Sequence, residues 1–479
     1  MKFKSDVIIG LEVHVELNTK TKLFCGCPTK PKQAQEDLPN SRCCPICLGM
    51  PGAKPVLNSK AVEFALKLCL ALNCEISPQL VFSRKSYFYP DMAKNYQISQ
   101  YEIPLGSSGK LSLSEGMEIG ISRIHMEEDP ASLVHPSGLK ESMYVLVDYN
   151  RSGNPLAEIV TEPCLESPQQ ARDFMKQLIT VLRYLEIFDV SNGIIKADAN
   201  ISIKESGYSR VEIKNITGFK EIESALFYEA GRQKEEIKHG RKIPNETRAW
   251  DSEKQITFPL RKKESEEDYG YIIDADLTAL EINHKRLYEI KKEMPELSRD
   301  KIRKFVGEYK IKKEDAKVLA SDKSLAEMFE KVAERVEPTL AAKWIRRELV
   351  RVLNYSKKEL HETNISEKHM VDLLKLVETK KITDNVAAKI LEKLIEKPFD
   401  VKEYVKKEGL EAVSDVSELE KYCRQAVEEN PTAVFDYKKG SGKALNFIVG
   451  KVMQKTKGKA TPKEVNEIIL GLIDAEKSA

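Results

Sequence analysis

The stretch from Ile8 to Leu17 alternates between apolar and polar side chains. Leu11 and Val13 share one side of this stretch, whereas Glu12 and His14 share the other. A period of two with β-branched residues predicts a half-buried β-strand, which requires a sheet with one apolar and one polar face. The Glu12 carboxylate and the His14 imidazole would lie about 7 Å apart and could converge on a cation such as Mg²⁺. A sheet face turned to water is the alternative.

Length and composition exclude several classes of protein. With 479 residues the chain is too long for one hydrophobic core, so we expect roughly two to four domains. Charged residues make up 32% of the chain but sum to a net charge of +2, so any nucleic-acid-binding surface must be local. The residues from Met1 to Asp6 lack the apolar segment of a secretion signal, and no apolar run is long enough to span a membrane. We therefore expect a cytoplasmic protein.

Cysteines cluster in a predicted loop from Thr19 to Pro55. A Cys-x-Cys pair and a Cys-x-x-Cys pair are formed by Cys25, Cys27, Cys44 and Cys47. Four thiolates are the ligand set of a closed structural zinc site, which leaves no open position for catalysis. We therefore predict bound Zn²⁺ in this loop, with Cys43 as the spare cysteine. Free thiols in a surface loop are the alternative.

Two further predicted strands carry carboxylates. The strand from Ile119 to Asp129 ends in His125-Met-Glu-Glu-Asp129, and the strand from Leu156 to Val160 contains Glu158. A lone carboxylate between apolar residues is costly unless it is paired or binds a metal. Glu158 is therefore a candidate ligand, although an edge strand that turns Glu158 to water would show the same pattern.

A hairpin with Gly207 in its connection is predicted next. Its polar faces carry Asp198, Asn200, Ser202, Glu212 and Lys214. Acids for a metal, a lysine for phosphate and amides for orientation suit a nucleotide site. A solvated sheet face is the alternative.

The segment from Phe82 to Gln100 is rich in hydroxyl, amide, aromatic and basic side chains and has no core pattern. Such residues suit the lining of a polar pocket or passage, and an exposed loop is the alternative.

Helices are predicted for residues 60–73, 169–184 and 219–238, and residues 298–406 show a helical pattern throughout. Residues 242–276 are polar and are expected to close the first domain. Tyr144 to Val147 is predicted as a short strand. We therefore expect an α+β fold whose sheet domain covers 1–292, with an all-α domain at 293–406 and a small helical tail domain at 407–479.

Positive charge gathers in this tail, where residues 437–463 contain eight lysines and no acid. The lysines are Lys438, Lys439, Lys443, Lys451, Lys455, Lys457, Lys459 and Lys463. A basic patch without interleaved aromatic residues or a groove-reading motif predicts contact with a phosphate backbone. A solvated lysine-rich face is the alternative. Gly440-Ser-Gly-Lys443 is not a phosphate-binding loop, because Ala444 stands where a Mg²⁺-binding hydroxyl belongs.

Several strings resemble the GatB/GatE family, the B and E subunits of tRNA-dependent amidotransferases. The strings are Gly10-Leu-Glu-Val-His-Val-Glu-Leu17, Tyr87-Phe-Tyr-Pro-Asp91, Tyr96-Gln-Ile-Ser-Gln100, His125-Met-Glu-Glu-Asp129, Asn150-Arg-Ser-Gly-Asn-Pro-Leu156, Asp198-Ala-Asn-Ile-Ser202, Glu212-Ile-Lys-Asn215 and Phe447-Ile-Val-Gly-Lys-Val-Met453. They run in order through the whole chain. The segment from Asp268 to Leu277 departs from the family's pattern, so no role is carried over to it.

The resemblance implies a cradle-shaped catalytic domain and an enzymatic function. Such subunits bind Glu-tRNA(Gln) or Asp-tRNA(Asn), phosphorylate the side-chain carboxylate with ATP and Mg²⁺, and replace the phosphate with ammonia. A separate amidase subunit supplies ammonia from glutamine, and a small third subunit holds the pair together, which makes a heterotrimer. No DNA and no membrane is implied.

The resemblance also implies roles for individual residues. The Mg²⁺ ligands would be Glu12, His14, Glu128 and Glu158, with Glu127 as the alternative to Glu128. The residues around nucleotide and acceptor would be Asp198, Asn200, Ser202, Glu212 and Lys214. The ammonia route would be lined by Lys85, Lys94, Tyr96, Gln97 and Ser99, with Lys94 facing a glutamate as a gate. The helical and tail parts would grip the tRNA.

Two other hypotheses use part of these features. A zinc-stabilised RNA-binding protein would tolerate replacement of Glu12, His14 and Glu158. An ATP-dependent ligase for a small acid would cleave ATP without tRNA. The amidotransferase hypothesis alone uses both the carboxylates and the basic tail.

Overall fold

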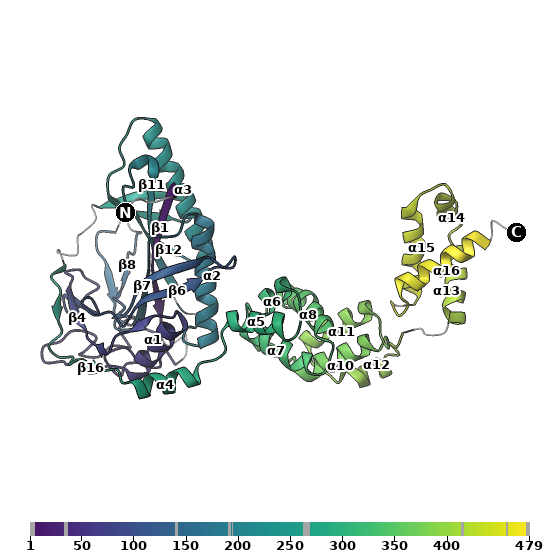
Figure 1. Ribbon diagram of the computed structural model, residues 1–479, viewed down its shortest axis with the longest axis horizontal. Coiled ribbons are helices and arrows are strands. Elements are labelled where there is room, and N and C mark those ends of the chain that lie inside the picture. The colour runs from purple at the N-terminus through teal and green to yellow at the C-terminus, as the bar shows by residue number, and fades with distance from the viewer. Residues whose placement is uncertain are drawn as a thin grey trace. The chain divides into compact units, whose positions relative to one another are not determined.

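A computed structural model describes residues 5–32, 37–138, 142–189, 193, 195–261, 269–412, 416–456 and 458–475. The chain divides into two compact units, Met1–Leu297 and Ser298–Ala479, which run from purple to teal and from green to yellow in Figure 1. Among the helices of these described ranges, none is both long enough and apolar enough to cross a membrane.

The first unit is built on a nine-stranded sheet in which β1 is a central strand. All neighbouring strands are antiparallel except β12 and β13. In spatial order the strands are β14 (Ile256–Arg261), β13 (Glu246–Asp251), β12 (Val211–Thr217), β11 (Ile195–Ile203), β1 (Val7–Glu16), β10 (Pro155–Thr161), β7 (Glu118–Glu128), β6 (Gly106–Ser112) and β2 (Glu75–Ile76). The predicted α+β class with a mainly antiparallel sheet is confirmed.

Three small sheets complete this unit. They are formed by β15 (Ile272–Ile273), β4 (Ser83–Ser86) and β5 (Tyr96–Ser99), by β16 (Leu280–Glu281) and β3 (Gln79–Leu80), and by β8 (Ser132–Val134) and β9 (Leu146–Asp148).

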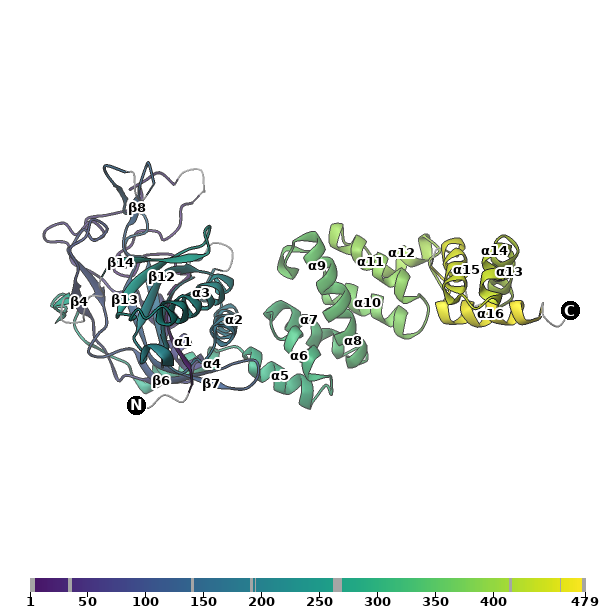
Figure 2. The ribbon, with the colours of Figure 1, turned by 90° about the horizontal axis from the view of Figure 1, so that it is seen from above.

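The alternation along β1 divides the large sheet into two faces. Leu11, Val13 and Val15 are at most 1% exposed and belong to the main hydrophobic core. Burying a side chain of this size stabilises the fold by roughly 1.5–3 kcal/mol. The helices of this unit are α1 (Ser59–Ala71), α2 (Pro168–Leu185), α3 (Phe219–Lys238) and α4 (His284–Glu293), and Figure 2 shows α2 and α3 side by side. Helices α1, α2 and α3 contact the sheet and add their apolar side chains to this core, so the polar side chains of β1 lie on the other face.

Local sequence signals explain where these helices begin. The Asn58 side chain accepts hydrogen bonds from the first backbone amides of α1, and the Ser167 hydroxyl accepts one from Gln170 ahead of α2, which has Pro168 in its first turn. Such caps satisfy amides that have no partner inside the helix. The three helices predicted for this unit are confirmed to within about two residues at each end.

The structure differs from the sequence prediction in three segments. The stretch from Phe82 to Gln100, predicted to line a polar pocket or passage, contains the short strands β4 and β5, and the polar stretch from 242 to 276 contains β13 and β14. The sequence of β13 lacks the apolar alternation of a strand, because its buried residues include the polar Thr247 and Arg248. Both side chains are tolerated in the interior because they pair with Glu212 and Glu229. The predicted strand from Tyr144 to Val147 begins two residues later, as β9.

In the described part of the second unit all regular structure is helical. The helices are α5 (Ser298–Gly307), α6 (Lys313–Leu319), α7 (Lys323–Ala333), α8 (Pro338–Trp344), α9 (Val350–Ser356), α10 (Glu367–Glu378), α11 (Asp384–Glu396), α12 (Val401–Lys407), α13 (Val416–Glu428), α14 (Pro431–Lys438), α15 (Gly442–Lys455) and α16 (Pro462–Ala475). A π-helical turn, Ile345–Leu349, lies between α8 and α9. Buried residues of α13 to α16, among them Cys423, Ile448 and Ile469, form one hydrophobic cluster.

Candidate functional site

Four side chains meet on the polar face where β1, β10 and β7 run side by side. The strand register places His14 opposite Glu158, and Glu158 opposite His125. Directly opposite residues of antiparallel strands project to the same face. Glu158 Oε2 lies 3.4 Å from His14 Nε2 and 3.0 Å from His125 Nε2, and Glu127 Oε1 lies 3.5 Å from His14 Nε2. Both carboxylates and His125 are buried, whereas His14 is half-buried and reaches the surface of this face.

Two imidazoles and two carboxylates balance each other electrostatically in this cluster. Burial alone lowers the pKa of His14, but the carboxylates of Glu158 and Glu127 outweigh it and raise the pKa to about 10. His125 behaves in the same way, with a pKa of about 9. Burial raises the pKa of Glu158, yet the two imidazoles outweigh it and hold the pKa well below its usual range. The two carboxylates thus favour the protonated form of both imidazoles, and a metal ion that binds His14 would have to displace its proton.

His14, Glu127 and Glu158 can hold a metal ion, because each offers a ligand atom and these atoms lie within 4.8 Å of one another. The two carboxylates suit a hard divalent cation. The imidazole departs from the all-oxygen ligand set that Mg²⁺ favours and is common at transition-metal sites. Buried His125 has no hydrogen-bond partner for its Nδ1 among the described residues, and it contacts both carboxylates of the set.

The structure separates the two adjacent glutamates of β7. Glu127 lies in the His/Glu cluster, whereas the Glu128 carboxylate accepts hydrogen bonds from the Lys94 ammonium and from the Ile98 amide. His125 joins the cluster although no role was predicted for it. The period of two along β7 carries the signal for both, since His125 and Glu127 share a face that Glu128 does not.

The predicted nucleotide residues continue this polar face across β11 and β12. Glu12 lies opposite Asp198 in the register, and Asn200 Nδ2 donates to Glu12 Oε1 at 2.9 Å. Lys214 Nζ lies 2.9 Å from Asp198 Oδ2 and 3.5 Å from Glu212 Oε1. Burial lowers the pKa of Lys214, but the carboxylates of Asp198 and Glu212 outweigh it and raise the pKa above its usual value. Glu12 therefore links this group to His14, two residues further along β1.

Ser202 lies opposite Ile8, at the start of β1 and farther along the face than Asp198 and Asn200. The Glu212 carboxylate also accepts a hydrogen bond of 2.8 Å from the Thr247 hydroxyl on β13, a residue that the sequence prediction did not include. Glu212 is thus fixed by β13 as well as by Lys214.

The residues predicted for the ammonia route lie on β4 and β5 or just before β5, and three of them contact the end of β7. Ser99 Oγ donates to Glu127 Oε2 at 3.3 Å, and Gln97 Nε2 donates to the Glu128 carbonyl at 2.8 Å. The third, Lys94, forms an ion pair with Glu128. Tyr96 lies under Lys94, with the ammonium 5.5 Å from the ring centroid. The polar side chains of β5 therefore adjoin the His/Glu cluster through the contact of Ser99 with Glu127.

Lys85 lies one residue along β4 from Arg84, and its ammonium is 4.6 Å from the centroid of the Tyr269 ring. No direct contact between Lys85 and the His/Glu cluster is present in the described part of the chain. Tyr101 and Tyr271 stack with their ring centroids 4.1 Å apart next to this pair. Lys85 thus lies within an aromatic group, apart from the other residues predicted for the ammonia route.

The four predicted zinc ligands come together in the loop after β1. Cys47 Sγ lies 3.4 Å from Cys25 Sγ and 3.7 Å from Cys27 Sγ and Cys44 Sγ. Tetrahedral thiolates at Zn–S distances of about 2.3 Å lie roughly 3.8 Å apart, so these cysteines can hold a metal. Cys43, the predicted spare, instead donates to the Asn40 carbonyl.

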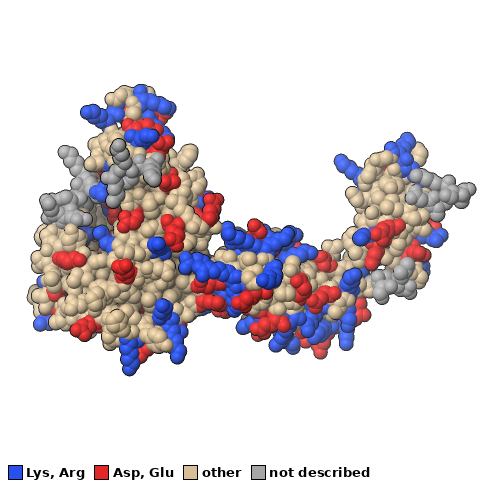
Figure 3. Space-filling view, in the orientation of Figure 1, with Lys and Arg blue, Asp and Glu red and all other residues tan. Residues whose placement is uncertain are grey.

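The lysines predicted to bind tRNA lie on α14 and α15 or beside them. Lys438, Lys439 and Lys443 are exposed, whereas Lys451, Lys455 and Lys459 are half-buried. Lys457 lies outside the described residues. Lys455 forms an ion pair of 2.7 Å with Glu429. Basic and acidic side chains are interspersed over the face of the second unit that Figure 3 shows.

The expectation that this patch lacks aromatic residues is wrong. Phe435 and Phe447 are 56% and 50% exposed, with Lys439 and Lys451 lying 4.3 Å and 5.3 Å from their ring centroids. Each lysine follows its phenylalanine by four residues, which is the spacing of neighbours on one helix face. An open hollow of about 500 Å³ beside Phe447 is lined in part by Asn430, Asp436 and Lys443.

The protein is therefore of the α+β class: a sheet domain whose polar face could hold a metal ion is followed, in the described residues, by helices alone. Residues 7–288 match the GatB/GatE catalytic domain, and residues 327–473 match the GatB domain. The chain belongs to the GatB/GatE family, as its motifs predicted.

Curated relatives resemble the chain over nearly its whole length. The B subunit of the aspartyl/glutamyl-tRNA(Asn/Gln) amidotransferase of Thermotoga maritima is 43% identical over 480 residues, covering 98% of this chain and 99% of the relative. The protein of the same name from Carboxydothermus hydrogenoformans is 41% identical over 474 residues, covering 97% and 98%. That of Haloquadratum walsbyi is 42% identical over 490 residues, covering 98% and 97%.

Proposed function

We propose that this chain is the B subunit of a glutamine-dependent amidotransferase that converts Glu-tRNA(Gln) or Asp-tRNA(Asn) into Gln-tRNA(Gln) or Asn-tRNA(Asn). The observation that carries the proposal is the continuous polar face from His125 through Glu158, His14 and Glu12 to Lys214, in a member of this family. Full-length similarity to proteins of that name supports it. The cytoplasm, where translation takes place, is the proposed location.

The reaction has two half-reactions. A side-chain carboxylate oxygen of the tRNA-bound amino acid attacks the γ-phosphorus of ATP, and ADP leaves. Ammonia then attacks the carbonyl carbon of the acyl phosphate, and phosphate leaves with the electrons of the broken C–O bond. The first step makes the oxygen a good leaving group, which an unmodified carboxylate lacks.

Each part of the polar face has a proposed role in these steps. His14, Glu127 and Glu158 hold Mg²⁺, with Glu12 on the same face and Glu128 beside it. A bound divalent cation offsets the negative charge that develops on the phosphates. When ATP binds, its phosphates replace Asp198 or Glu212 as partners of the Lys214 ammonium. Asn200 orients Glu12 through its hydrogen bond. Asp198, Ser202 and Glu212 complete the nucleotide side.

Zn²⁺ is the proposed occupant of the cysteine loop. Four thiolates that converge from two short motifs fill a tetrahedral coordination shell, so this metal would support the fold and take no part in the chemistry. The proposed partners are the amidase subunit, the small third subunit and the charged tRNA, whose elbow the second unit would grip.

The proposal is tested by reconstitution of the chain with its two partner subunits, γ-labelled ATP and Mg²⁺, without glutamine. We expect ATP cleavage with Glu-tRNA(Gln) or Asp-tRNA(Asn) and none with the uncharged tRNAs. Cleavage with free glutamate and no tRNA would point to a ligase for small acids. Tight tRNA binding without any cleavage would point to a binding protein and would overturn the proposed kinase step.

Lys94→Met is expected to lower glutamine-dependent amidation at least about tenfold while tRNA-dependent ATP cleavage persists. The substitution removes the ammonium that binds Glu128, next to the Gln97 and Ser99 contacts with β7. Amide formation with glutamine and with ammonium chloride should be compared. Lys110→Met is the matched control, because Lys110 pairs with Glu118 on the surface. Equal losses with both nitrogen donors would contradict a role in ammonia delivery.

Replacing both Phe435 and Phe447 with alanine is expected to raise the Kd for charged tRNA at least about tenfold, because stacking of a base on an aromatic ring contributes roughly 1–3 kcal/mol. Filter binding at two salt concentrations measures the effect. The salt dependence should stay unchanged, since no lysine is removed. Phe227→Ala, which removes an exposed ring from α3, is the control. An unchanged Kd in the double variant would exclude this surface.

A further inference from the structure

A buried lysine lies beside the cysteine cluster. The side chain of Lys22 is fully buried, and its Nζ lies 3.5 Å from Cys47 Sγ and 3.2 Å from the Tyr149 carbonyl oxygen. Among the described residues no carboxylate lies within ion-pair distance of this ammonium. A buried charge without an anion is costly, because it loses its hydration and gains little in return. Lys22 therefore requires negative charge from the sulfur atoms.

The cysteine cluster supplies this charge when it holds a metal. Four thiolates around a divalent cation carry a net charge of −2, and Cys47, which contacts Lys22, is also within 3.7 Å of the other three sulfur atoms. An ammonium that donates to a ligating thiolate stabilises this excess charge, as partners behind the ligands do at other metal sites. The donor set and the cation next to it thus fit each other.

The second contact of Lys22 leads to the candidate active site. Tyr149 belongs to the turn formed by residues 148–154, which runs directly into β10 and Glu158. The Lys22 side chain also covers Gly153, whose carbonyl accepts a hydrogen bond from the Leu23 amide. Gly153 adopts φ +84°, and a Cβ there would lie 3.5 Å from the Lys22 stem. The turn is thus held between the lysine and the backbone of the cysteine loop.

Other residues of the cysteine loop hold the same turn. Asn40 accepts from the Tyr149 amide at 2.7 Å and donates to the Val147 carbonyl, and the Arg42 amide donates to Asn150 Oδ1 at 2.8 Å. At its far end the turn bonds to the polar face, since Asn154 Nδ2 donates to Glu16 Oε1 at 2.7 Å. The contacts run without a gap from the sulfur atoms to β1 and β10.

We infer that Lys22 is a positioning residue that offsets the negative charge of a metal-bound tetrathiolate and, through the Tyr149 carbonyl, couples metal binding to the position of the 148–154 turn. Because its side chain is fully buried, Lys22 would act through the residues that it contacts. The inference rests on the proposed zinc site, and it adds a residue and a route by which that site acts on β10.

Lys22→Met tests the charge, because methionine keeps the apolar stem and removes the ammonium. In the full chain we expect zinc transfer to the chelator 4-(2-pyridylazo)resorcinol to be at least tenfold faster than in wild type. With Co²⁺ in place of Zn²⁺, the thiolate-to-cobalt charge-transfer bands should shift, since one sulfur loses its hydrogen bond. Lys22→Arg should retain zinc. Lys30→Met is the matched control, because Lys30 lies in the same loop but binds Asn18 and Asp189.

Amide hydrogen exchange in the wild-type chain tests the coupling without any variant. Removal of zinc is expected to accelerate exchange of the Gly153 and Asn154 amides at least tenfold and to leave the centre of α2 unchanged. Release rates and cobalt spectra that match wild type in Lys22→Met would overturn the charge role, and unchanged exchange in the turn would overturn the coupling. A wild-type chain that binds no zinc would overturn this inference together with the zinc site, while tRNA-dependent ATP cleavage would leave the proposed function standing.

Discussion

Replacing Glu158 with glutamine is expected to lower charged-tRNA-dependent ATP cleavage by roughly a hundred- to a thousandfold. Glutamine keeps the size of the side chain but removes the negative charge that His14 and His125 share. It also removes one of the two carboxylates of the proposed cation site, so the phosphates would lose part of the charge that stabilises their transfer. The measurement is the initial rate of ADP formation with saturating charged tRNA.

A matched control separates this effect from general damage. Glu162→Gln makes the same chemical change at an exposed residue just after β10 and should leave the rate unchanged. The affinity for charged tRNA should also persist in Glu158→Gln, because the tail is untouched. A rate within about threefold of wild type would exclude the His/Glu cluster as the site of phosphoryl transfer.

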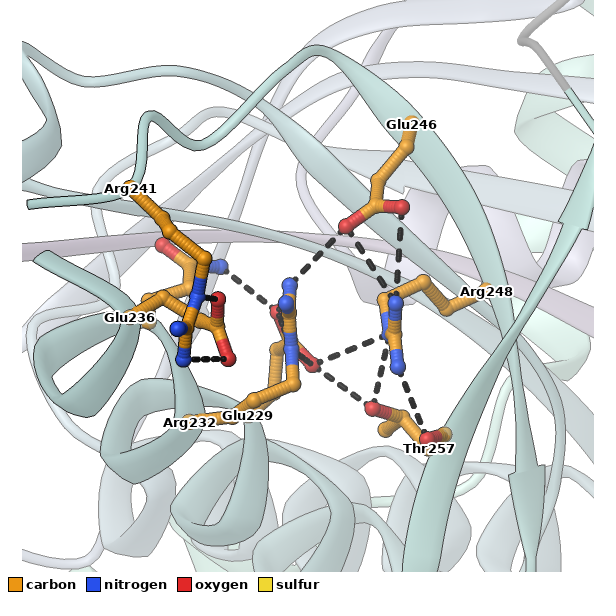
Figure 4. A network of polar contacts seen from close by, with 8 residues as sticks. Glu229, Arg232, Glu236, Arg241, Glu246, Arg248 and Thr257 are labelled. Carbon is orange, nitrogen blue, oxygen red and sulfur yellow. Dashed lines mark hydrogen bonds and ion pairs between the residues drawn. The ribbon is translucent and has the colours of Figure 1, made fainter. Parts of the chain in front are cut away.

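Replacing Glu229 with alanine is expected to lower the free energy of unfolding of the first unit by about 3–5 kcal/mol. Glu229 is fully buried and lies between two arginines, at 2.6 Å from Arg232 and 3.4 Å from Arg248. Figure 4 shows that Glu246 bridges the same arginines and that Thr257 bonds to both Glu229 and Arg248. Alanine would leave the buried Arg248 and the half-buried Arg232 with one shared carboxylate, which is the costly way to break a buried pair.

Hydrogen exchange of the β13 and β14 amides measures this loss locally, because a chain with two compact units need not unfold in one step. Glu236→Ala is the control on the same helix, since Glu236 pairs with Arg241 at the surface and its loss should not change exchange in these strands. If Glu229→Ala leaves exchange unaltered, Glu229 adds nothing to stability, and Thr257 and Glu246 are enough to hold Arg248.

Predictions were confirmed where an element depends on interactions between residues close in sequence, and they failed where it depends on contacts between different elements. The ends of α3 match the predicted residues 219–238, and β1 carries the predicted alternation, because both depend on neighbours within a few residues. Strand β13 was missed, since its buried Arg248 pairs with Glu229 on a helix. A polar residue that finds its partner far away in the sequence looks like a surface residue in the sequence itself.

The candidate site shows the same division. Motifs named Glu12, His14 and Glu158 correctly as residues of one polar face, but they did not separate Glu127 from Glu128. Glu127 and Glu128 project to opposite faces of the sheet. Which of them joins Glu158 depends on the register between β7 and β10, and that register is set by packing of the whole sheet.

The sequence alone determined the α+β class, the polar strand at 8–17, the four clustered cysteines and the family, because each rests on local periodicity or on short motifs. Tertiary structure alone decided that His125 joins His14 and Glu158, that Lys22 is buried against Cys47, and that Lys214 reaches Asp198. These contacts join residues from different strands and loops, and their geometry depends on register and burial, which arise when the whole chain packs.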